Sequence, residues 1–440
     1  MGRLLDVHRN TIIAVYQELN AQGWVNLVPN KGTFVVTLKP EKVRNKAGIH
    51  HYPSQTGFDF EKLTLLDNPF EYTRCKHVFT DGTPDVRLTQ IDDHSRFYSA
   101  SMKRRSNRKK MNYYNQEGSE YFKKQLSTYL NLSRGLRIST DNLLITRSME
   151  MSLFIISEIL LRPGDIVVVG TPGYFSANMS FQKSGAQIKT IPVDDHGIDT
   201  RALRQICKQH HIRLVYVTPR HHYPTTVSLD TLRRKELLQL AAEFKFVIVE
   251  DDYDYDFHYE FPDLLPMAAS DTEGMIIYLG SFGKSLAPGF RTGFAVAPEN
   301  LMREMRKFLG IVDRQGDILM EQALGEMIEE GAIYRHLKKS LKIYGERRAL
   351  MAGILEQDLG DWLHFGLPSG GLAFWTTWKR PVNLMKLSMT TAQNDLFIPK
   401  TLLYQNKELC AMRIGFGHLD QNELQQSILI LKDALLSITY

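Results

Sequence analysis

The chain has 440 residues, 43% of them hydrophobic and 23% charged, so it can bury a large core and should form more than one domain. No run of about 18 apolar residues occurs, and the N-terminus lacks the pattern of a secretion signal, so the sequence supports neither a membrane span nor secretion. The net charge of +5 permits a nucleic-acid partner without requiring one. The three cysteines show no metal-like spacing and fit a reducing cytoplasm, where we expect the protein.

Residues 1–37 predict a helix followed by a hairpin. Four apolar residues recur at helical spacing: Ile12, Val15, Tyr16 and Leu19. The stretch "WVNLVPNKGTFVV" predicts two strands around a turn at Asn30 to Gly32. Such a unit is too small to bury a core alone. Residues 38–57 are polar and basic and contain two prolines, which predicts a linker.

Short apolar runs recur in the next part of the chain. They lie at residues 142–148, 165–174, 213–224, 246–256, 274–284 and 291–298. Their continuous Val, Ile and Leu content is typical of strands buried on both faces. We therefore predict an α/β domain over residues 58–315, with a mostly parallel sheet covered by helices.

The C-terminal part, residues 316–440, predicts a smaller α/β domain. Long charged helices are followed by two glycine-flanked strands, "SGGLAFWTTW" and "CAMRIGFG". Asp420 and Glu423 have the spacing of a capping box at the start of a last helix. The apolar face of that helix is formed by Leu424, Ile428, Leu431 and Leu435.

Residues able to do chemistry follow the predicted strands, at the edge where such sheets bind ligands. They are Ser148, Tyr174, Tyr223, Asp251 and Lys284. Lys284 ends a buried run in "YLGSFGKSLAPGFRTGF", where loss of hydration lowers the pKa of a lysine and makes its amine a nucleophile toward an aldehyde. A single lysine is more often a solvated surface charge, so this interpretation depends on its neighbours.

An aldehyde cofactor built on a pyridine ring needs an acid at the ring nitrogen and an aromatic side chain on the ring face. Asp251 could supply the acid, although "EDDYDYD" could equally cap a helix or bind a cation. Tyr253 could donate to the phenolic oxygen of the ring. Tyr174 could stack on the ring, or "TPGY" could be an ordinary turn with an aromatic plug.

The phosphate of such a cofactor also needs donors. Ser281 and Arg291 flank Lys284, and Arg291 offers a fork-shaped donor. Ser148 and Met149 open a predicted helix, whose free N–H groups favour an anion. The segment "RSMEM" contains no glycine, which phosphate-binding turns often use.

The motifs "YNQEG", "TPGY", "HYPT", "EDDYD", "SFGK-x6-R" and "RIGFG", in this order, resemble the fold-type I aminotransferase family, which uses pyridoxal 5′-phosphate. The resemblance covers roughly residues 58–440 and implies a large and a small α/β domain. The pair "EDDYDYDFHY" and "SFGKSLAPGFRTGF" is particularly similar to the MocR-type subfamily of GntR transcription regulators, which joins a winged helix-turn-helix DNA reader to an aminotransferase-like domain. The N-terminal "LLDVHRNTIIAVYQELNAQGWVNLVPNKGTFV" resembles the recognition helix and wing of that reader.

The resemblance assigns a role to each candidate. Lys284 would hold the cofactor as an internal aldimine, Asp251 would pair with the pyridinium, and Tyr253 would face the phenolic oxygen. The further cofactor contacts that it implies are Tyr174, Ser281 and Arg291, and we expect Ser148, Met149 and Tyr223 to bind the cofactor with them. Tyr223 stands where true aminotransferases of this fold commonly carry asparagine.

Two further matches concern the substrate and the neighbouring subunit. Arg413 in "MRIGF" matches the arginine that binds a substrate carboxylate. Tyr114 matches a tyrosine that reaches the phosphate of the neighbouring subunit, which implies a homodimer. The sequence departs from the family at "TRSMEMS", where a glycine is usual, and at residues 224–226, where the usual "PTG" reads "PTT". We expect the phosphate turn and the ring-facing loop to be remodelled there.

In the DNA reader, Arg9, Asn10 and Thr11 would open the recognition helix in the major groove, and Lys31 would lie in the wing. The chain starts inside what would be the helix before the turn, so we expect a truncated reader. The segment "KRRSNRKK" at residues 103–110 could contact DNA backbone but is more typical of a solvated helix end. We expect no metal site, because no ligand spacing of Cys, His or carboxylates occurs.

Three functions remain open at this stage. The first is a pyridoxal phosphate-dependent, DNA-binding transcription regulator that senses an amino acid or amine through an external aldimine. The second is an active aminotransferase acting on an amino acid, in which Lys284 also moves a proton. The third is a protein that folds but binds neither cofactor nor DNA.

Overall fold

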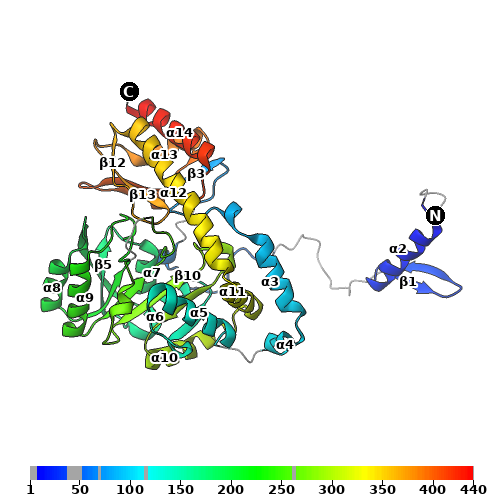
Figure 1. Ribbon diagram of the computed structural model, residues 1–440. Helices are drawn as coiled ribbons and strands as arrows, with labels where there is room; N and C mark the ends of the chain where they lie inside the picture. Colours follow the sequence, from blue (N-terminus) through cyan, green and yellow to red (C-terminus); the bar gives the residue numbers. More distant parts are fainter. Residues whose placement is uncertain (1–6, 37–51, 68–70, 113–116, 260–263, 440) are drawn as a thin grey trace. The chain divides into compact units, whose positions relative to one another are not determined.

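The computed structural model describes residues 7–36, 52–67, 71–112, 117–259 and 264–439. The chain divides into two compact units, Met1–Lys62 and Leu63–Tyr440 (Figure 1). No helix in these described ranges is long and apolar enough to cross a membrane.

The N-terminal unit consists of one helix and one hairpin. Helix α2 (Arg9–Ala21) is followed by β1 (Val25–Val28) and β2 (Gly32–Val35), which pair antiparallel. The turn between the strands contains Asn30 and Gly32, both with left-handed φ values, of 59° and 115°. The helix and the hairpin therefore form where the sequence predicts them. Trp24, 64% exposed, illustrates how little apolar surface this unit buries among its described residues.

The second unit contains an eight-stranded sheet with strand order β4-β11-β10-β9-β8-β5-β6-β7. The strands are β4 (Leu143–Thr146), β5 (Ile166–Thr171), β6 (Gln187–Asp194), β7 (Gly197–Ile198), β8 (Ile212–Val217), β9 (Val247–Asp251), β10 (Ile276–Ser281) and β11 (Gly293–Val296). The pairs from β10 through β9, β8 and β5 to β6 are parallel, whereas β11 and β7 run antiparallel to their neighbours. The predicted mostly parallel sheet is confirmed.

Helices cover both faces of this sheet, which explains the continuous apolar runs. Along β10, Ile276 and Tyr278 enter the core on one face, while Ile277 and Leu279 enter the core on the other. The first face is covered by α5 (Glu120–Arg134), α8 (Thr200–Gln209), α9 (Thr231–Phe244) and α11 (Ile318–Glu329), and the second by α6 (Met149–Leu160), α7 (Phe175–Lys183) and α10 (Glu299–Val312). Burying both faces removes apolar area from water on each side of the strand, which is the main stabilising contribution here.

One long strand of the sheet has no counterpart among the predicted ones. Strand β6 lies near the edge of the sheet, and five of its eight residues, starting with Gln187, are polar or proline. Four of its eight residues are exposed, and it carries no continuous apolar run. A pattern search for fully buried strands misses such an edge strand.

The C-terminal part builds a second, smaller sheet with its own core. Its antiparallel strands are β12 (Leu363–Phe365), β13 (Ala373–Trp378), β16 (Cys410–Gly415) and β15 (Leu403–Gln405). Its helices are α12 (Ala332–Leu359), α13 (Leu384–Gln393) and α14 (Gln421–Thr439). The predicted capping box is present at α14, since the Asp420 N–H donates to Glu423 Oε2 at 2.7 Å and the Glu423 N–H donates to Asp420 Oδ1 at 2.9 Å.

A segment from early in the chain joins this C-terminal part. Strand β3 (His77–Val78) pairs parallel with β14 (Leu396–Phe397), and Phe79 is fully buried in the C-terminal core. We expected this segment in the large domain, residues 58–315, whereas in the structure it pairs with a strand of the C-terminal part. Helices α3 (Ile91–Lys103) and α4 (Arg105–Arg108) follow and lead back to the large sheet.

Candidate active site at the carboxyl edge of the large sheet

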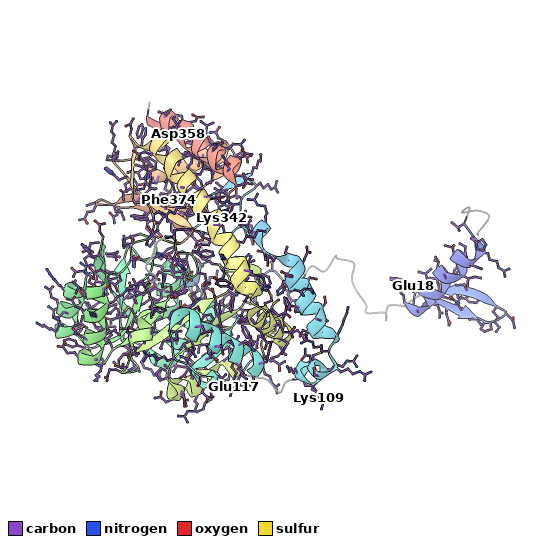
Figure 2. The ribbon with its side chains drawn as sticks, viewed as in Figure 1. Glu18, Lys109, Glu117, Lys342, Asp358 and Phe374 are labelled. Carbon is purple, nitrogen blue, oxygen red and sulfur yellow. The ribbon has the colours of Figure 1, made fainter. Side chains whose placement is uncertain are left out.

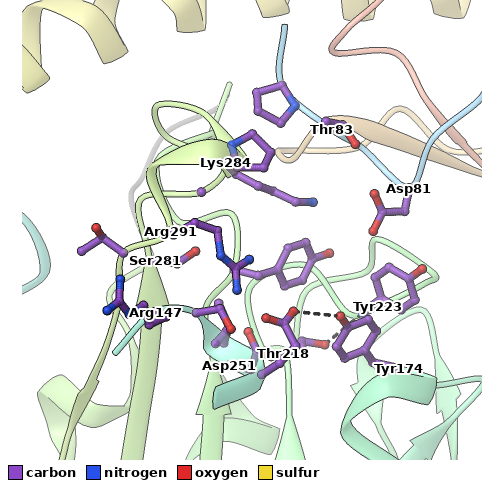
Figure 3. A pocket seen from close by; sticks show the side chains of 18 of the residues that line it. Asp81, Thr83, Arg147, Tyr174, Thr218, Tyr223, Asp251, Ser281, Lys284 and Arg291 are labelled. Atoms are coloured by element: carbon purple, nitrogen blue, oxygen red, sulfur yellow. Dashed lines mark hydrogen bonds between the residues drawn. The ribbon is translucent and has the colours of Figure 1, made fainter. Parts of the chain in front are cut away.

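A cavity of about 280 Å³ lies where β4, β9 and β10 end and where α6 and α7 begin (Figure 3). Nine of the residues singled out in the sequence line it: Ser148, Met149, Tyr174, Tyr223, Asp251, Tyr253, Ser281, Lys284 and Arg291. They gather because the carboxyl ends of these strands share one edge of the sheet. Tyr114 lies outside the described residues. Within the described ranges, no group of three or more His, Cys, Asp or Glu could hold a metal ion.

Lys284 follows β10 and extends into the cavity. Burial lowers the pKa of its ammonium group, while the carboxylates of Asp81 and Asp254 act in the opposite direction. Its Nζ lies 4.5 Å from the centroid of the Tyr253 ring. A buried lysine of lowered pKa supplies more of the neutral amine that attacks an aldehyde.

Asp251 is the last residue of β9 and is 3% exposed. Its Oδ2 accepts a hydrogen bond from the Tyr216 hydroxyl at 2.6 Å, whereas its buried Oδ1 has no hydrogen-bond partner among the described residues. Burial is the main cause that raises the pKa of the Asp251 carboxyl to about 8. A buried acceptor left unpaired costs free energy, so this oxygen favours an N–H donor placed in the cavity.

The other acids of "EDDYDYD" have partners outside the cavity. Asp254 Oδ1 lies 2.9 Å from His221 Nδ1, and Asp252 Oδ2 accepts from the Tyr278 hydroxyl at 2.8 Å. Glu250 accepts from the Met267 and Ala268 N–H groups at 2.7 and 2.8 Å, and so caps a short 3-10 helix, Met267–Ser270. Asp251 is the acid of this run that lines the cavity, so the motif serves both the capping and the ligand interpretation.

Three tyrosines form an aromatic wall. The rings of Tyr174 and Tyr223 meet edge to face with centroids 5.0 Å apart, and those of Tyr223 and Tyr253 are 6.2 Å apart. The Tyr174 hydroxyl donates to Glu150 Oε1 at 3.4 Å. The Tyr253 hydroxyl donates to the backbone oxygen of His221 at 3.0 Å, so its predicted bond to a phenolic oxygen would compete with this one.

The opposite side of the cavity carries cations and hydroxyls. Arg291, Ser281 and Arg147 lie together there (Figure 3). The Ser148 Oγ accepts from the Met151 N–H at 3.2 Å and thus caps α6. Arg291 has a left-handed backbone, with φ of 48°.

Arg147 was not among the predicted site residues. Its Nε donates to Asp313 Oδ2 at 2.6 Å, and this ion pair fixes a guanidinium at the cavity wall. The sequence offered one signal, since Arg147 stands in "TRSMEMS", at the predicted phosphate turn. The Arg147 guanidinium thus offers side-chain donors at the place where a glycine-containing turn would offer backbone N–H donors.

Arg413 does not line the cavity. It is 1% exposed, and its guanidinium carbon lies 4.7 Å from the centroid of the Tyr223 ring. Its Nε donates to the Asp81 oxygen at 2.8 Å, its Nη1 to the Pro224 oxygen at 2.7 Å and its Nη2 to the Tyr253 hydroxyl at 3.4 Å. Its predicted contact with a substrate carboxylate remains a prediction.

The loop that carries Tyr223 departs from ideal geometry. Thr226 has a φ of 64°, a left-handed conformation that β-branched residues rarely adopt. Its N–H donates to the His222 oxygen at 2.7 Å, which holds the turn. The sequence departure from "PTG" to "PTT" therefore changes the side chain but keeps a glycine-like backbone.

Sequence reasoning missed half of the cavity wall. The residues not predicted are Asp81, Thr83, Pro84, Arg147, Glu150, Tyr216, Thr218, Gly283, Pro288 and Thr292. Several adjoin a predicted residue and follow from the same strand ends. Asp81 lies in "FTDGTPD", remote from every predicted strand of the large sheet, and nothing in the sequence signals it.

The predicted DNA-contacting residues lie in the N-terminal unit. Arg9, Asn10 and Thr11 form the exposed first turn of α2, and Lys31 is exposed in the hairpin turn. They are accessible to a partner, and their contact with DNA remains a prediction.

The sequence of this chain is similar to those of known aminotransferases and of a transcription regulator. Residues 83–420 match the family described as aminotransferase class I and II. The probable rhizopine catabolism regulatory protein MocR of Rhizobium meliloti is 26% identical, with 100% of this chain and 88% of the relative covered. Aromatic-amino-acid aminotransferase 1 of Thermococcus litoralis is 27% identical over 69% of this chain and 74% of its own length.

Among solved structures, the kynurenine aminotransferase of Pyrococcus horikoshii, in complex with PMP, superposes with a TM-score of 0.75. It is 26% identical, and the match covers 82% of this chain and 91% of that structure. The fold-type I aminotransferase fold predicted from the sequence is thereby confirmed, and pyridoxal 5′-phosphate is the cofactor.

The residues present fit this group. The unpartnered Oδ1 of Asp251 suits the N–H of a protonated pyridine ring, and the Lys284 amine lies in the same cavity. Arg291, Ser281 and Arg147 offer hydrogen-bond donors and positive charge for a phosphate.

Proposed function

Because the chain belongs to the aminotransferase class I and II family, we propose that it is a pyridoxal phosphate-dependent transcription regulator whose family domain senses an amino acid or amine. The observation that carries the proposal is that one chain combines an exposed helix-and-hairpin unit with a cavity built around Lys284 and Asp251. The regulator MocR, matched over 100% of this chain, supports the same combination.

In this proposal, pyridoxal phosphate supplies an aldehyde for primary amines and an electron-withdrawing ring. The Lys284 amine would hold the cofactor, and the free Oδ1 of Asp251 would accept a hydrogen bond from the N–H of the protonated ring. Tyr174 and Tyr223 exclude water from one side of the cavity. Arg291 and Ser281 bind the phosphate.

A bound amine would alter contacts that join the two sheets of the second unit. Arg413 belongs to β16 of the small sheet and donates to Asp81 and to Pro224, beside the cavity. A ligand that binds one arrangement of these contacts better than another shifts the population toward it. The N-terminal unit would then bind DNA differently in the two states.

An active aminotransferase is the second candidate. The Thermococcus aminotransferase supports it, and Lys284 is placed to move a proton within the cavity. A stoichiometric keto-acid assay with many amino acids separates the candidates, because sustained turnover contradicts a pure sensor.

The first experiment is the visible absorption spectrum of the protein with added pyridoxal phosphate. The parent should show the band of the lysine-bound cofactor, and borohydride reduction followed by mass spectrometry should locate the cofactor on Lys284. Lys284→Ala should lose both signals. Lys342→Ala, which changes an exposed lysine on α12 (Figure 2), is the matched control and should keep them. No band in the parent would contradict the proposal.

A second measurement addresses DNA. Fluorescence anisotropy with DNA from upstream of the protein's own gene should show binding, and the joint Arg9→Ala and Asn10→Ala change should weaken it. The control Lys342→Ala should bind as the parent does. Equal binding by the double variant would mean that these residues of α2 do not contact the DNA.

A further inference from the structure

Asp81 places a carboxylate in the cavity opposite Lys284 (Figure 3). It lies in the segment between β3 and α3 and is half-buried. Its side chain makes no hydrogen bond or ion pair with any described residue. An unpaired carboxylate that faces a cavity favours a cationic partner there.

Contacts fix the backbone around Asp81 and hold this residue at the cavity wall. The Asp81 oxygen accepts from Arg413 Nε at 2.8 Å, and the Thr80 oxygen accepts from the Gly415 N–H at 2.8 Å. Gly82 has a left-handed φ of 106°, and a Cβ added to it would lie 3.4 Å from the Ala373 Cβ. The segment is thus packed against β13 and β16.

The cations around Asp81 are committed to other contacts. Arg413 already donates from each of its three nitrogens. The Lys284 amine is the group that the proposed function assigns to the cofactor. Arg147 is paired with Asp313 on the other side of the cavity, near Arg291.

A second acid lines the cavity. Glu150 lines the cavity and accepts from the Tyr174 hydroxyl. The part of the wall that carries Asp81 therefore offers a carboxylate without a partner, whereas Arg147 and Arg291 lie together on another part of the wall. A ligand carboxylate placed beside Asp81 would be repelled by it.

We propose that the ligand of this site is an amine with a second cationic group, such as a diamine or a basic amino acid, and that Asp81 binds that second group. The inference rests on the proposed function and narrows its ligand class. A charge-assisted hydrogen bond of this kind strengthens binding by roughly 10- to 100-fold.

The test uses the protein loaded with pyridoxal phosphate and follows the cofactor absorption band as amines are added. Two matched pairs differ by one cationic group: cadaverine against pentylamine, and lysine against norleucine. The parent should bind the dicationic member of each pair roughly 10- to 100-fold more tightly. In Asp81→Asn this ratio should fall to about one.

Asp92→Asn, which changes an exposed acid at the start of α3, is the matched control and should keep the parent ratio. A parent ratio near one, a ratio that survives in Asp81→Asn, or tighter binding of glutamate than of lysine would overturn the inference alone. A loaded protein whose band responds to none of these amines would overturn the proposed function, and the inference with it. These outcomes are distinguishable, because the response to the monoamines reports on the proposed function and the affinity ratio reports on the inference.

Discussion

The two sides of the cavity are built differently. Around Asp251 the side chains are buried and held by short-range contacts at the ends of β9 and β8, such as the bond from Tyr216. Around Arg147 and Arg291 they are more exposed, and the ion pair that fixes Arg147 joins residues 166 positions apart. The side around Asp251 depends on strand ends, which a sequence pattern can locate. The side around Arg147 depends on a pairing between distant segments, which a sequence pattern cannot predict.

The largest effect should come from breaking the buried side. Asp251→Asn removes the charge that the free Oδ1 offers to a ring N–H, and we expect pyridoxal phosphate affinity to fall by roughly 10- to 100-fold. Fluorescence titration with the cofactor measures this, with Asp92→Asn as the control. An affinity within twofold of the parent would mean that the burial of Asp251 serves packing alone.

The same carboxyl should give the cofactor-free protein a pH-dependent stability. The pKa of Asp251 is raised to about 8 in the folded state, and an unfolded aspartate titrates near 4, so between these values the folded state binds one more proton. The free energy of unfolding should then fall as pH rises from about 5 toward 8, by up to ~1.4 kcal/mol per pH unit from this group. Glu250, with its pKa raised to about 7, acts in the same direction.

Urea unfolding at several pH values measures this slope. Asp251→Asn should flatten it, since the asparagine does not titrate, while the contribution of Glu250 remains. A slope that is identical in parent and variant would show that the Asp251 carboxyl is ionised in the folded, cofactor-free protein.

A smaller effect is expected on the more exposed side. Arg147→Ala removes one of two guanidinium groups and should weaken pyridoxal phosphate binding about tenfold, while leaving the binding of pyridoxal, which has no phosphate, unchanged. Arg147→Lys keeps the charge without the fork and should recover part of the affinity. Equal losses for both compounds would assign Arg147 a structural role through Asp313.

The sequence was informative where a residue's chemistry and its strand position coincide. Lys284 and Asp251 each end a continuous apolar run, so both the buried sheet and the shared edge followed from the pattern. Arg413 was correctly expected in an apolar strand, but only packing shows that it lies behind Tyr223. Asp81 reaches the cavity because its segment packs on β13 and β16, and no local pattern encodes such a contact.

The smallest predicted effect tests whether the buried side is free of strain. Thr226 holds a left-handed φ of 64° in the loop behind Tyr223, and such a conformation costs a residue with a Cβ about 1–2 kcal/mol. Thr226→Gly removes that cost but adds freedom to the unfolded chain, worth ~0.5–1 kcal/mol in the opposite direction. The net expectation is a free energy of unfolding higher by up to about 1.5 kcal/mol, measured by urea unfolding. Thr226→Ala, which keeps a Cβ without the branch, should fall between the two, and a glycine variant less stable than the parent would mean that the threonine side chain makes a compensating contact.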